Sequence, residues 1–226
     1  MVEQTTVTYS EAHWKNLEAL RYEAIRFMEP LHKAHIECLT YGSLARGDIT
    51  AKSDIDIFIP TPPDPTIIEI ILEREGIQET NREIVQATPG YAAKGYIYVG
   101  ELRSYSFPLT SLLTSEREFY TFAGSASWSD LKSGSRILGV DKRLLLIEPT
   151  QEGHLESPIH GREGTVARLL HVDTRIVLER VRTLERRQRV GRTGVYLKRS
   201  LAPGEGFGEV LEELSLKRPA LRRRMI

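Results

Sequence analysis

The 226-residue chain has little of what marks the specialised classes of protein. Cys38 is its only cysteine, so no disulfide can form within the chain, and nothing indicates an oxidising compartment. No uncharged apolar run approaches the roughly 20 residues that a membrane-spanning helix needs. Residues 1–10 lack the basic start and the apolar stretch of a signal peptide. We therefore expect a soluble protein that is not exported, with the cytoplasm as its location.

The scarcity of certain residues and motifs argues against several kinds of catalytic site. The six histidines show no spacing that builds a zinc site, and Cys38 stands alone, which argues against transition-metal chemistry. Neither a Ser-His-Asp order nor a phosphate loop of the Gly-Lys-Ser/Thr type is present. Asparagine occurs only at Asn16 and Asn81 while Arg and Glu are abundant, a composition typical of a heat-adapted, thermophile source.

The chain carries no net charge, but its two parts are opposite in sign. Residues 1–153 hold 15 Lys and Arg against 22 Asp and Glu, net −7, and residues 154–226 hold 16 against 9, net +7. We predict two domains with these bounds, since the Gly-, Pro- and His-rich stretch 152–164 lies between them. A basic domain favours a nucleic-acid or phosphate-rich partner. Mutual attraction of the two parts is an equally good explanation of the charges.

The first part predicts an α/β fold, a mixed sheet with flanking helices. Apolar residues at three- and four-residue steps predict helices, and runs with β-type patterns predict strands. The predicted helices are 11–33, which Pro30 should bend or end near its last turn, and 66–75. The predicted strands are 36–41, 54–60, 83–87, 91–99, 102–107 and 144–148.

The basic part predicts a small helical domain. Two helices, 166–171 and 174–189, are separated by a turn at Val172-Asp173, and a short strand follows at 195–199. The order of helix, turn, longer helix and strand is that of a winged helix-turn-helix. His171 stands where glycine is usual in that motif, which is a departure from it.

The most informative stretch joins a Gly-Ser turn to two carboxylates. Gly42-Ser43 follows a strand, and Asp54 and Asp56 lie on the next one, where alternate residues share a face. Two anions about 7 Å apart on an otherwise buried strand are costly unless a cation neutralises them, which predicts Mg²⁺ or Mn²⁺. Gly42 allows close approach of the backbone to a phosphate, and the Ser43 hydroxyl and Arg46 can meet its charge.

Together these residues, with Ser53 before the first carboxylate, resemble the active-site signature of the DNA polymerase β-like nucleotidyltransferase superfamily, among them predicted nucleotidyltransferases of archaeal type. The resemblance implies a palm-like sheet, a nucleoside triphosphate such as ATP, and two divalent ions. It implies transfer of a nucleoside monophosphate to an acceptor hydroxyl with release of pyrophosphate. Asp54 and Asp56 would then hold the metals, and Gly42, Ser43, Arg46 and Ser53 the nucleotide.

A second stretch, 118–125, is similar to the hairpin and Phe-Thr-Gly-Ser-type turn with which family X DNA polymerases hold the incoming nucleotide. That resemblance implies that Phe122 and Gly124 line the sugar and base, and that Ser125 opens a helix. The alternative is an aromatic hairpin edge packed on the sheet.

One departure from the family concerns the third carboxylate. Counting back from Gly124 leads to Ser106 or Ser104, not to an acid. Glu101 is the nearest candidate, and a bulge at Gly100 would bring it into phase. Glu101 is thus the candidate third catalytic acid, and without it a catalytically impaired regulator that senses nucleotide or binds nucleic acid is the alternative function.

The basic part also holds a row of arginines. Arg175, Arg182, Arg186 and Arg189 fall at helical spacing away from the apolar stripe, with Arg192 and Lys198 beyond them. Such a row can follow a phosphate backbone, so these residues are candidates for nucleic-acid binding. A solvated helix face with pairs such as Glu185 to Arg189 is the alternative.

Overall fold

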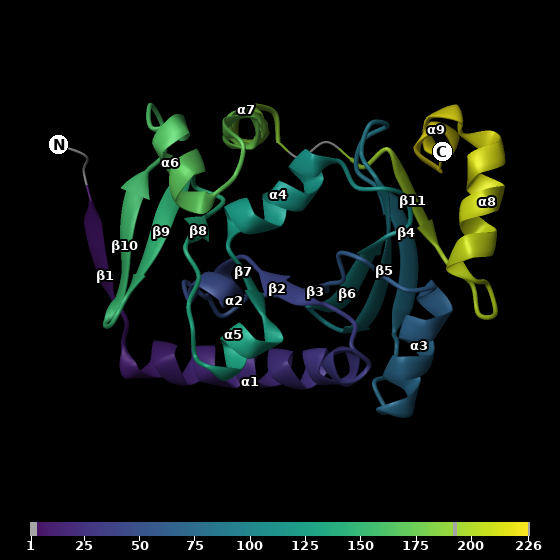
Figure 1. Ribbon diagram of the computed structural model, residues 1–226, viewed down its shortest axis with the longest axis horizontal. Coiled ribbons are helices and arrows are strands. Elements are labelled where there is room, and N and C mark those ends of the chain that lie inside the picture. The colour runs from purple at the N-terminus through teal and green to yellow at the C-terminus, as the bar shows by residue number, and fades with distance from the viewer. Residues whose placement is uncertain (1–3, 192–193, 226) are drawn as a thin grey trace. The chain divides into compact units, whose positions relative to one another are not determined.

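The computed structural model describes residues 4–191 and 194–225 (Figure 1). The backbone divides into two compact units, each assembled from segments far apart in the sequence. The first unit holds the described residues of 1–25, 39–54 and 114–193, and the second those of 26–38, 55–113 and 194–226. This division differs from the predicted boundary after residue 153, because both units combine segments from the two predicted domains.

The helices and strands carry the labels of Figure 1. The helices are α1 (Glu11–Lys33), α2 (Ser43–Arg46), α3 (Pro65–Arg74), α4 (Thr114–Ala123), α5 (Trp128–Lys132), α6 (Glu163–Leu170), α7 (Thr174–Val190), α8 (Phe207–Lys217) and α9 (Pro219–Met225). The strands are β1 (Thr5–Thr8), β2 (Leu39–Tyr41), β3 (Ile55–Phe58), β4 (Asn81–Gln86), β5 (Ala93–Gly100), β6 (Arg103–Pro108), β7 (Ser125–Ser127), β8 (Gly139–Val140), β9 (Leu145–Thr150), β10 (Gly153–Pro158) and β11 (Leu197–Ser200).

In the first unit, β1, β10, β9 and β8 form an antiparallel sheet in that order, and β2 pairs with β7. The hairpin of β9 and β10 starts its pairing at Thr150 and Gly153. Residue 153 therefore begins a strand that pairs on both sides. The predicted boundary cuts this hairpin because the sequence shows its Gly and Pro but not its long-range partner β1.

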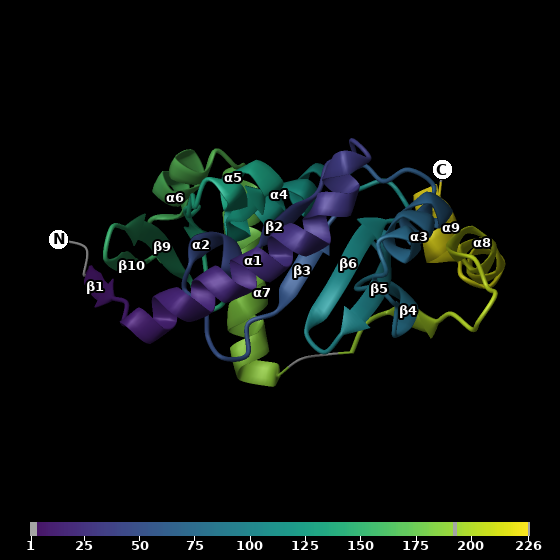
Figure 2. The same ribbon diagram turned by 90° about the horizontal axis from the view of Figure 1, so that it is seen from below.

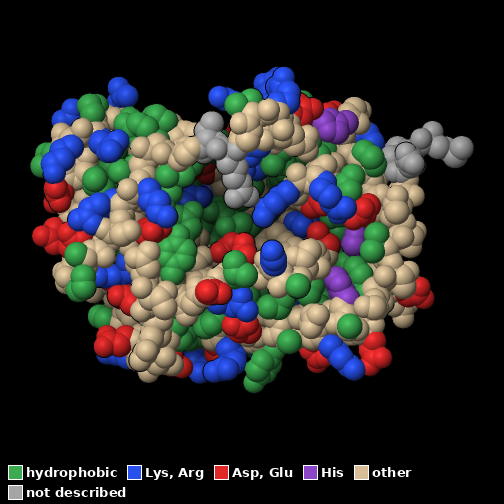
Figure 3. Space-filling model, turned by 180° about the vertical axis from the view of Figure 1, so that it is seen from behind, with side chains coloured by type: hydrophobic (Ala, Val, Ile, Leu, Met, Phe, Trp, Pro, Cys, Tyr) green, Lys and Arg blue, Asp and Glu red, His purple; other side chains and the backbone are tan. Residues whose placement is uncertain are grey.

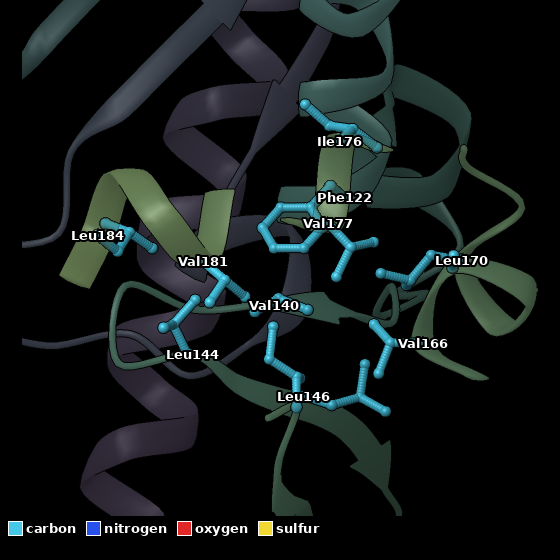
Figure 4. Packing of buried hydrophobic residues seen from close by; sticks show 12 residues of the cluster. Phe122, Val140, Leu144, Leu146, Val166, Leu170, Ile176, Val177, Val181 and Leu184 are labelled. Atoms are coloured by element: carbon cyan, nitrogen blue, oxygen red, sulfur yellow. The ribbon is translucent and has the colours of Figure 1, made fainter. Parts of the chain in front are cut away.

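The core of the first unit lies between α4, α6, α7 and the strands β8 and β9 (Figure 4). The side chains that fill it are apolar and almost wholly buried: Phe122, Val140, Leu144, Leu146, Ile159, Val166, Ala167, Leu170, Ile176, Val177, Val181 and Leu184. At about 25 cal/mol per Å² of apolar surface, burial of this kind is the main favourable term in folding. The row Val177, Val181 and Leu184 confirms the apolar stripe predicted for α7.

In the second unit, β11, β4, β5, β6 and β3 lie side by side in that order. Only β3 and β6 are parallel within this set, so the predicted mixed sheet is confirmed. Ile55 and Ile57 face the core, with exposed fractions of 0% and 1%. The buried face is tightly covered: a Cβ on Gly95 would lie 2.4 Å from the Phe107 ring and 3.0 Å from the Phe207 ring of α8.

The predicted helices 11–33 and 66–75 are confirmed within a residue. Ser10 begins α1 by accepting a hydrogen bond from the His13 backbone, and Pro30 does not end the helix, which continues to Lys33 (Figure 2). The Asp64 carboxylate caps α3 by accepting from the Thr66 backbone at 2.9 Å. Local capping and apolar spacing are enough to set these elements.

Two predicted elements differ in the structure. The hairpin expected in 118–125 is wrong, because 114–123 forms α4, whose buried side chains recur at helical spacing. The strand expected at 195–199 exists as β11, but it pairs with β4 of the second unit. It therefore extends the sheet of that unit where a wing beside α7 was expected. No helix of the described residues is long and apolar enough to cross a membrane.

Candidate nucleotide-binding site

The Gly42-Ser43 turn connects β2 to the short helix α2. Gly42 has a φ of +81°, a left-handed conformation that glycine adopts without strain. Nothing lies within 4 Å of the point where a Cβ would stand on this residue, so that side of the turn is open. Its backbone N–H donates to the Gly124 carbonyl at 2.9 Å. The turn is thus fixed by its neighbour and still accessible to a ligand.

A hydroxyl contact joins this turn to the loop before β3. The Oγ atoms of Ser43 and Ser53 lie 3.1 Å apart, and Ser53 Oγ also accepts from the Thr50 backbone at 2.9 Å. Ser53 directly precedes Asp54 in the chain. The first unit therefore brings the Gly42-Ser43 turn next to Ser53 and Asp54, and their role in binding a nucleotide stays a prediction.

Asp54 and Asp56 are separated by one residue at the start of β3. Asp54 is exposed and Asp56 is partly buried, whereas Ile55 between them is fully buried. Because side chains alternate along a strand, Asp56 lies on the side of β3 opposite to Ile55 and Ile57, and Asp54 directly precedes the strand. The Oδ1 atom of Asp56 accepts a hydrogen bond of 2.6 Å from the Ser104 hydroxyl.

Ser104 is the direct partner of Asp56 in the parallel pairing of β3 with β6. The position that faces Asp56 on the neighbouring strand is therefore a serine, as counting along the sequence indicated. Glu101 lies in the exposed turn between β5 and β6, and the pairing shifts register between Tyr98 and Gly100, where a bulge was predicted. In this arrangement the Ser104 hydroxyl contacts Asp56, and the catalytic role of Glu101 stays a prediction.

The polar side of the same sheet continues across β5 to β4. The Tyr98 hydroxyl donates to Glu83 Oε2 at 3.1 Å, and the rings of Tyr96 and Tyr98 stack with centroids 6.1 Å apart. Burial, and next the Asp56 charge, raises the pKa of Tyr96 to about 12. Both tyrosines are therefore neutral donors at neutral pH. Sequence reasoning missed them, although Tyr96 and Tyr98 share the alternation that places Asp56 and Ser104 on this face.

Arg46 supports the turn from inside the protein. Its side chain is buried and makes two hydrogen bonds to the Asp48 carboxylate, of 2.9 and 2.8 Å. Its Nη1 donates to the carbonyl of Ala123 at 2.6 Å. With its donors directed to these partners, Arg46 fixes α2 to the end of α4, and direct contact with a phosphate stays a prediction.

The second predicted stretch meets the first at Gly124. Gly124 accepts from Gly42, and Ser125 pairs with Tyr41 in the ladder of β7 and β2. This places Gly124 and Ser125 beside the Gly-Ser turn. Phe122, by contrast, points into the core among Val177 and Val140 and is 2% exposed (Figure 4). The structure thus corrects the expected contact of Phe122 with a sugar or base, and Ser125 opens β7, not a helix.

The predicted nucleic-acid residues fall into different settings. Arg182, Arg186 and Arg189 are exposed on α7, away from its buried stripe, and Figure 3 shows Lys and Arg side chains projecting at the upper edge, where α7 lies in Figure 1. Arg175 pairs with Asp173 at 2.7 Å. Lys198 pairs with Glu83 of the second unit at 3.2 Å. Arg192 lies outside the described residues.

Arg182, Arg186 and Arg189 form a row on the exposed side of α7. In the described ranges 4–191 and 194–225, no ion pair joins Arg182, Arg186 or Arg189 to an acidic residue. The pair of Glu185 with Arg189 that the sequence allowed is not formed, since Glu185 lies 3.8 Å from His160. Within the described residues the row is thus a solvated positive surface whose members form no ion pair.

The donor set at Asp54 and Asp56 fits a hard divalent cation that also binds phosphate oxygens. Mg²⁺ is usually held by one or two carboxylates together with substrate phosphates, so the chemistry of Asp54 and Asp56 suits such a cation. Among the described residues, no group of three or more His, Cys, Asp or Glu side chains could hold a metal by itself. A cation held by these carboxylates would complete its coordination with water and with oxygens of a bound substrate.

Comparison with known proteins agrees with this geometry. A family model described as "Nucleotidyltransferase domain" matches residues 22–104. No curated protein matches the chain in sequence. The matched segment contains the Gly42-Ser43 turn, Asp54, Asp56 and Ser104, and the match supports a general nucleotidyl transfer activity, with a nucleoside triphosphate as substrate.

Proposed function

We propose that the protein is a Mg²⁺- or Mn²⁺-dependent nucleotidyltransferase that transfers a nucleoside monophosphate to an acceptor hydroxyl on a nucleic acid, a protein or a small molecule. The observation that carries this proposal is the contact of Ser43 with Ser53, which sets the Gly-Ser turn beside the loop that enters the Asp54 and Asp56 strand. A triphosphate held at the turn would present its phosphates to these carboxylates.

Each residue of the candidate site would have a separate role in the reaction. Gly42 leaves the turn open, and the Ser43 hydroxyl can donate to a phosphate oxygen. Asp54 and Asp56 would hold the divalent ions, which when bound supply charge neutralisation at the phosphates. The acceptor hydroxyl gives up its proton to a base or to solvent, its oxygen attacks the α-phosphorus, the bond to the bridging oxygen breaks, and pyrophosphate leaves. Positioning and electrostatics account for most catalysis in transfers of this kind.

Incubation with each of the four ribonucleoside triphosphates, labelled at the α-phosphate, tests this proposal. With Mg²⁺ and a mixture of RNA, DNA and protein as acceptors, we expect label to appear in one acceptor fraction. A parallel reaction with excess EDTA should give none. Label that appears equally with EDTA would contradict the assigned role of the two carboxylates.

A second candidate function is a regulator that binds nucleotide without transferring it. The observation that favours it is Ser104, an uncharged residue, at the position that faces Asp56. Clear triphosphate binding by calorimetry, with no label in any acceptor, would select this alternative.

Adding the missing carboxylate should make stability depend on metal. In Ser104→Asp, a second carboxylate would replace the hydroxyl that donates to Asp56, so we expect a lower melting temperature without metal and recovery of most of the loss with Mg²⁺. Ser106→Asp is the matched control, because Ser106 faces Phe58. Thermal melts with and without Mg²⁺ measure the melting temperatures of both variants. Equal recovery of the two variants would contradict a cation site at Asp56.

We also propose that the arginine row of α7 binds nucleic acid. Arginines without base-reading partners contact phosphates, so binding should weaken steeply with salt. Arg182→Gln, Arg186→Gln and Arg189→Gln together should flatten the logarithmic salt slope by roughly two to three units, at about 0.9 per phosphate on a duplex. The full-length protein and a labelled RNA or DNA duplex serve for the titrations.

The control for this experiment removes three charges elsewhere, at Lys15, Arg26 and Arg74, which are exposed. Its salt slope should equal that of the wild type. If both triple variants change the slope equally, the attraction comes from overall charge and not from α7. If the wild type binds neither duplex nor single strand at low salt, the arginine row has no such role.

A further inference from the structure

Arg21 of α1 is a buried cation that binds α2, the helix that follows the Gly42-Ser43 turn. Only 7% of the residue is exposed. Its Nε donates to the Leu44 carbonyl at 3.1 Å, and its Nη2 donates to the Ala45 carbonyl at 2.8 Å. Its Nη1 donates to the Ser135 carbonyl at 2.8 Å. Two of these three acceptors belong to α2, the helix that begins at Ser43.

These hydrogen bonds stabilise a helix that is too short to be stable by itself. A helix of four residues forms at most a single turn, and the last carbonyls of any helix lack partners within it. The planar fork of an arginine can bind two neighbouring carbonyls at once, which a lysine cannot do with the same geometry. The His13 ring adds a contact of 2.8 Å to the Gly47 carbonyl at the same end of α2. The position of α2, and with it the turn at Gly42, therefore depends on α1.

The charge of Arg21 is not neutralised within the described part of the chain, where all its hydrogen bonds go to carbonyls. Burial, and next the nearby Arg136 charge, lowers the pKa of Arg21 to about 10, so the side chain stays protonated at neutral pH. Arg46, in contrast, forms a two-bond pair with Asp48. A buried cation without a carboxylate is costly, and such a charge is usually compensated by a ligand or a partner.

The guanidinium of Arg21 is close enough to the Gly42-Ser43 turn for its charge to attract an anion bound there. Four residues of helix rise about 6 Å, which is less than the Debye length of about 8 Å at physiological salt. Leu44, Ala45 and Arg46 of α2 are buried, and charges in a buried setting are screened less than in water. A polyanion at Gly42-Ser43 would thus lie within the field of Arg21.

We propose that Arg21 is a positioning residue for the triphosphate: it fixes α2 through the Leu44 and Ala45 carbonyls and supplies a positive charge whose counter-charge is the bound phosphate chain. This inference rests on the proposed nucleotide binding, and it assigns to the buried face of α1 a part in that binding. Arg21 touches no reacting atom and acts through the turn.

Calorimetry with Arg21→Gln tests this assignment, using as probes the triphosphate that the wild type binds most tightly and the corresponding nucleoside, both with Mg²⁺. We expect the Kd for the triphosphate to rise at least tenfold, and the Kd for the nucleoside to stay within twofold. Hydrogen exchange of the backbone amides in 42–47 should become faster. Arg26→Gln, an exposed change on the same helix, should alter none of these values.

The outcomes separate the role of Arg21 from the proposed function. A folded Arg21→Gln protein with unchanged triphosphate affinity would overturn the role of Arg21, as would an equal loss of affinity for triphosphate and nucleoside. If that variant does not fold, Arg21→Lys replaces it. For Arg21→Lys we expect a smaller loss of triphosphate affinity and faster hydrogen exchange in 42–47. No change in either quantity would overturn the proposal. A wild type that binds no triphosphate would contradict the proposed function itself.

Discussion

Asp54→Asn together with Asp56→Asn should abolish Mg²⁺-dependent triphosphate binding and lower nucleotide transfer at least about 100-fold, the scale on which single preorganised electrostatic groups act. The substitutions keep the size of both side chains and remove both charges. Calorimetry with and without Mg²⁺ measures binding, and product formation measures transfer.

The same double variant should not lose stability. Two anions on one face of a strand repel each other, so their removal should leave the melting temperature unchanged or raise it. The hydrogen bond from Ser104 to position 56 can still form with an amide oxygen. Glu75→Gln, an exposed change beyond α3, serves as the control and should behave as the wild type. Wild-type transfer by the double variant would show that these carboxylates do not hold the catalytic ions.

Gly139→Ala should damage both the fold and the site. A Cβ on Gly139 would stand 2.4 Å from the Gly124 nitrogen and 2.6 Å from the Ala123 carbonyl carbon. These are backbone atoms, which cannot turn away as a side chain can. We expect a loss of about 1–3 kcal/mol in the free energy of unfolding, typical of overpacking. Because Gly124 holds Gly42 through its carbonyl, triphosphate affinity should fall as well.

Gly164→Ala is the matched control for this change. Gly164 lies in the first turn of α6, with nothing within 4 Å of its Cβ position. Alanine is the better helix former by up to about 1 kcal/mol, so this variant should be as stable as the wild type or more so. Urea unfolding measures the free energy of unfolding of both variants. Equal stability of Gly139→Ala and the wild type would mean that the contact with Gly124 relaxes without cost.

The sequence predicted the elements whose pattern is local. The apolar spacing of α1 and of the helix predicted at 66–75, and the alternation around Ile55 and Ile57, appear in the structure as expected. The Gly-Ser turn and the Asp54 and Asp56 strand were also readable, because a strand fixes which residues share a face. Counting along the chain led to Ser106 or Ser104 in place of a third acid, and Ser104 is the residue that pairs with Asp56.

What the sequence could not predict depends on contacts between distant segments. The aromatic residues of α4 suit a helix and a hairpin equally, and the choice rests on packing of Phe122 against α7. The pairing of β11 with β4 joins residues more than 100 positions apart. The partners of Arg46 and the carbonyls bound by Arg21 follow from how α1, α2 and α4 meet, which no local pattern encodes.

The most direct test of nucleotidyl transfer compares two positions of label in the same triphosphate. With wild-type protein, Mg²⁺ and the acceptor fraction that becomes labelled, we expect label from the α-phosphate to enter the acceptor in equal amount with the pyrophosphate released. Label from the γ-phosphate should appear only in pyrophosphate. Entry of γ-label into the acceptor, or release of orthophosphate in its place, would contradict the account.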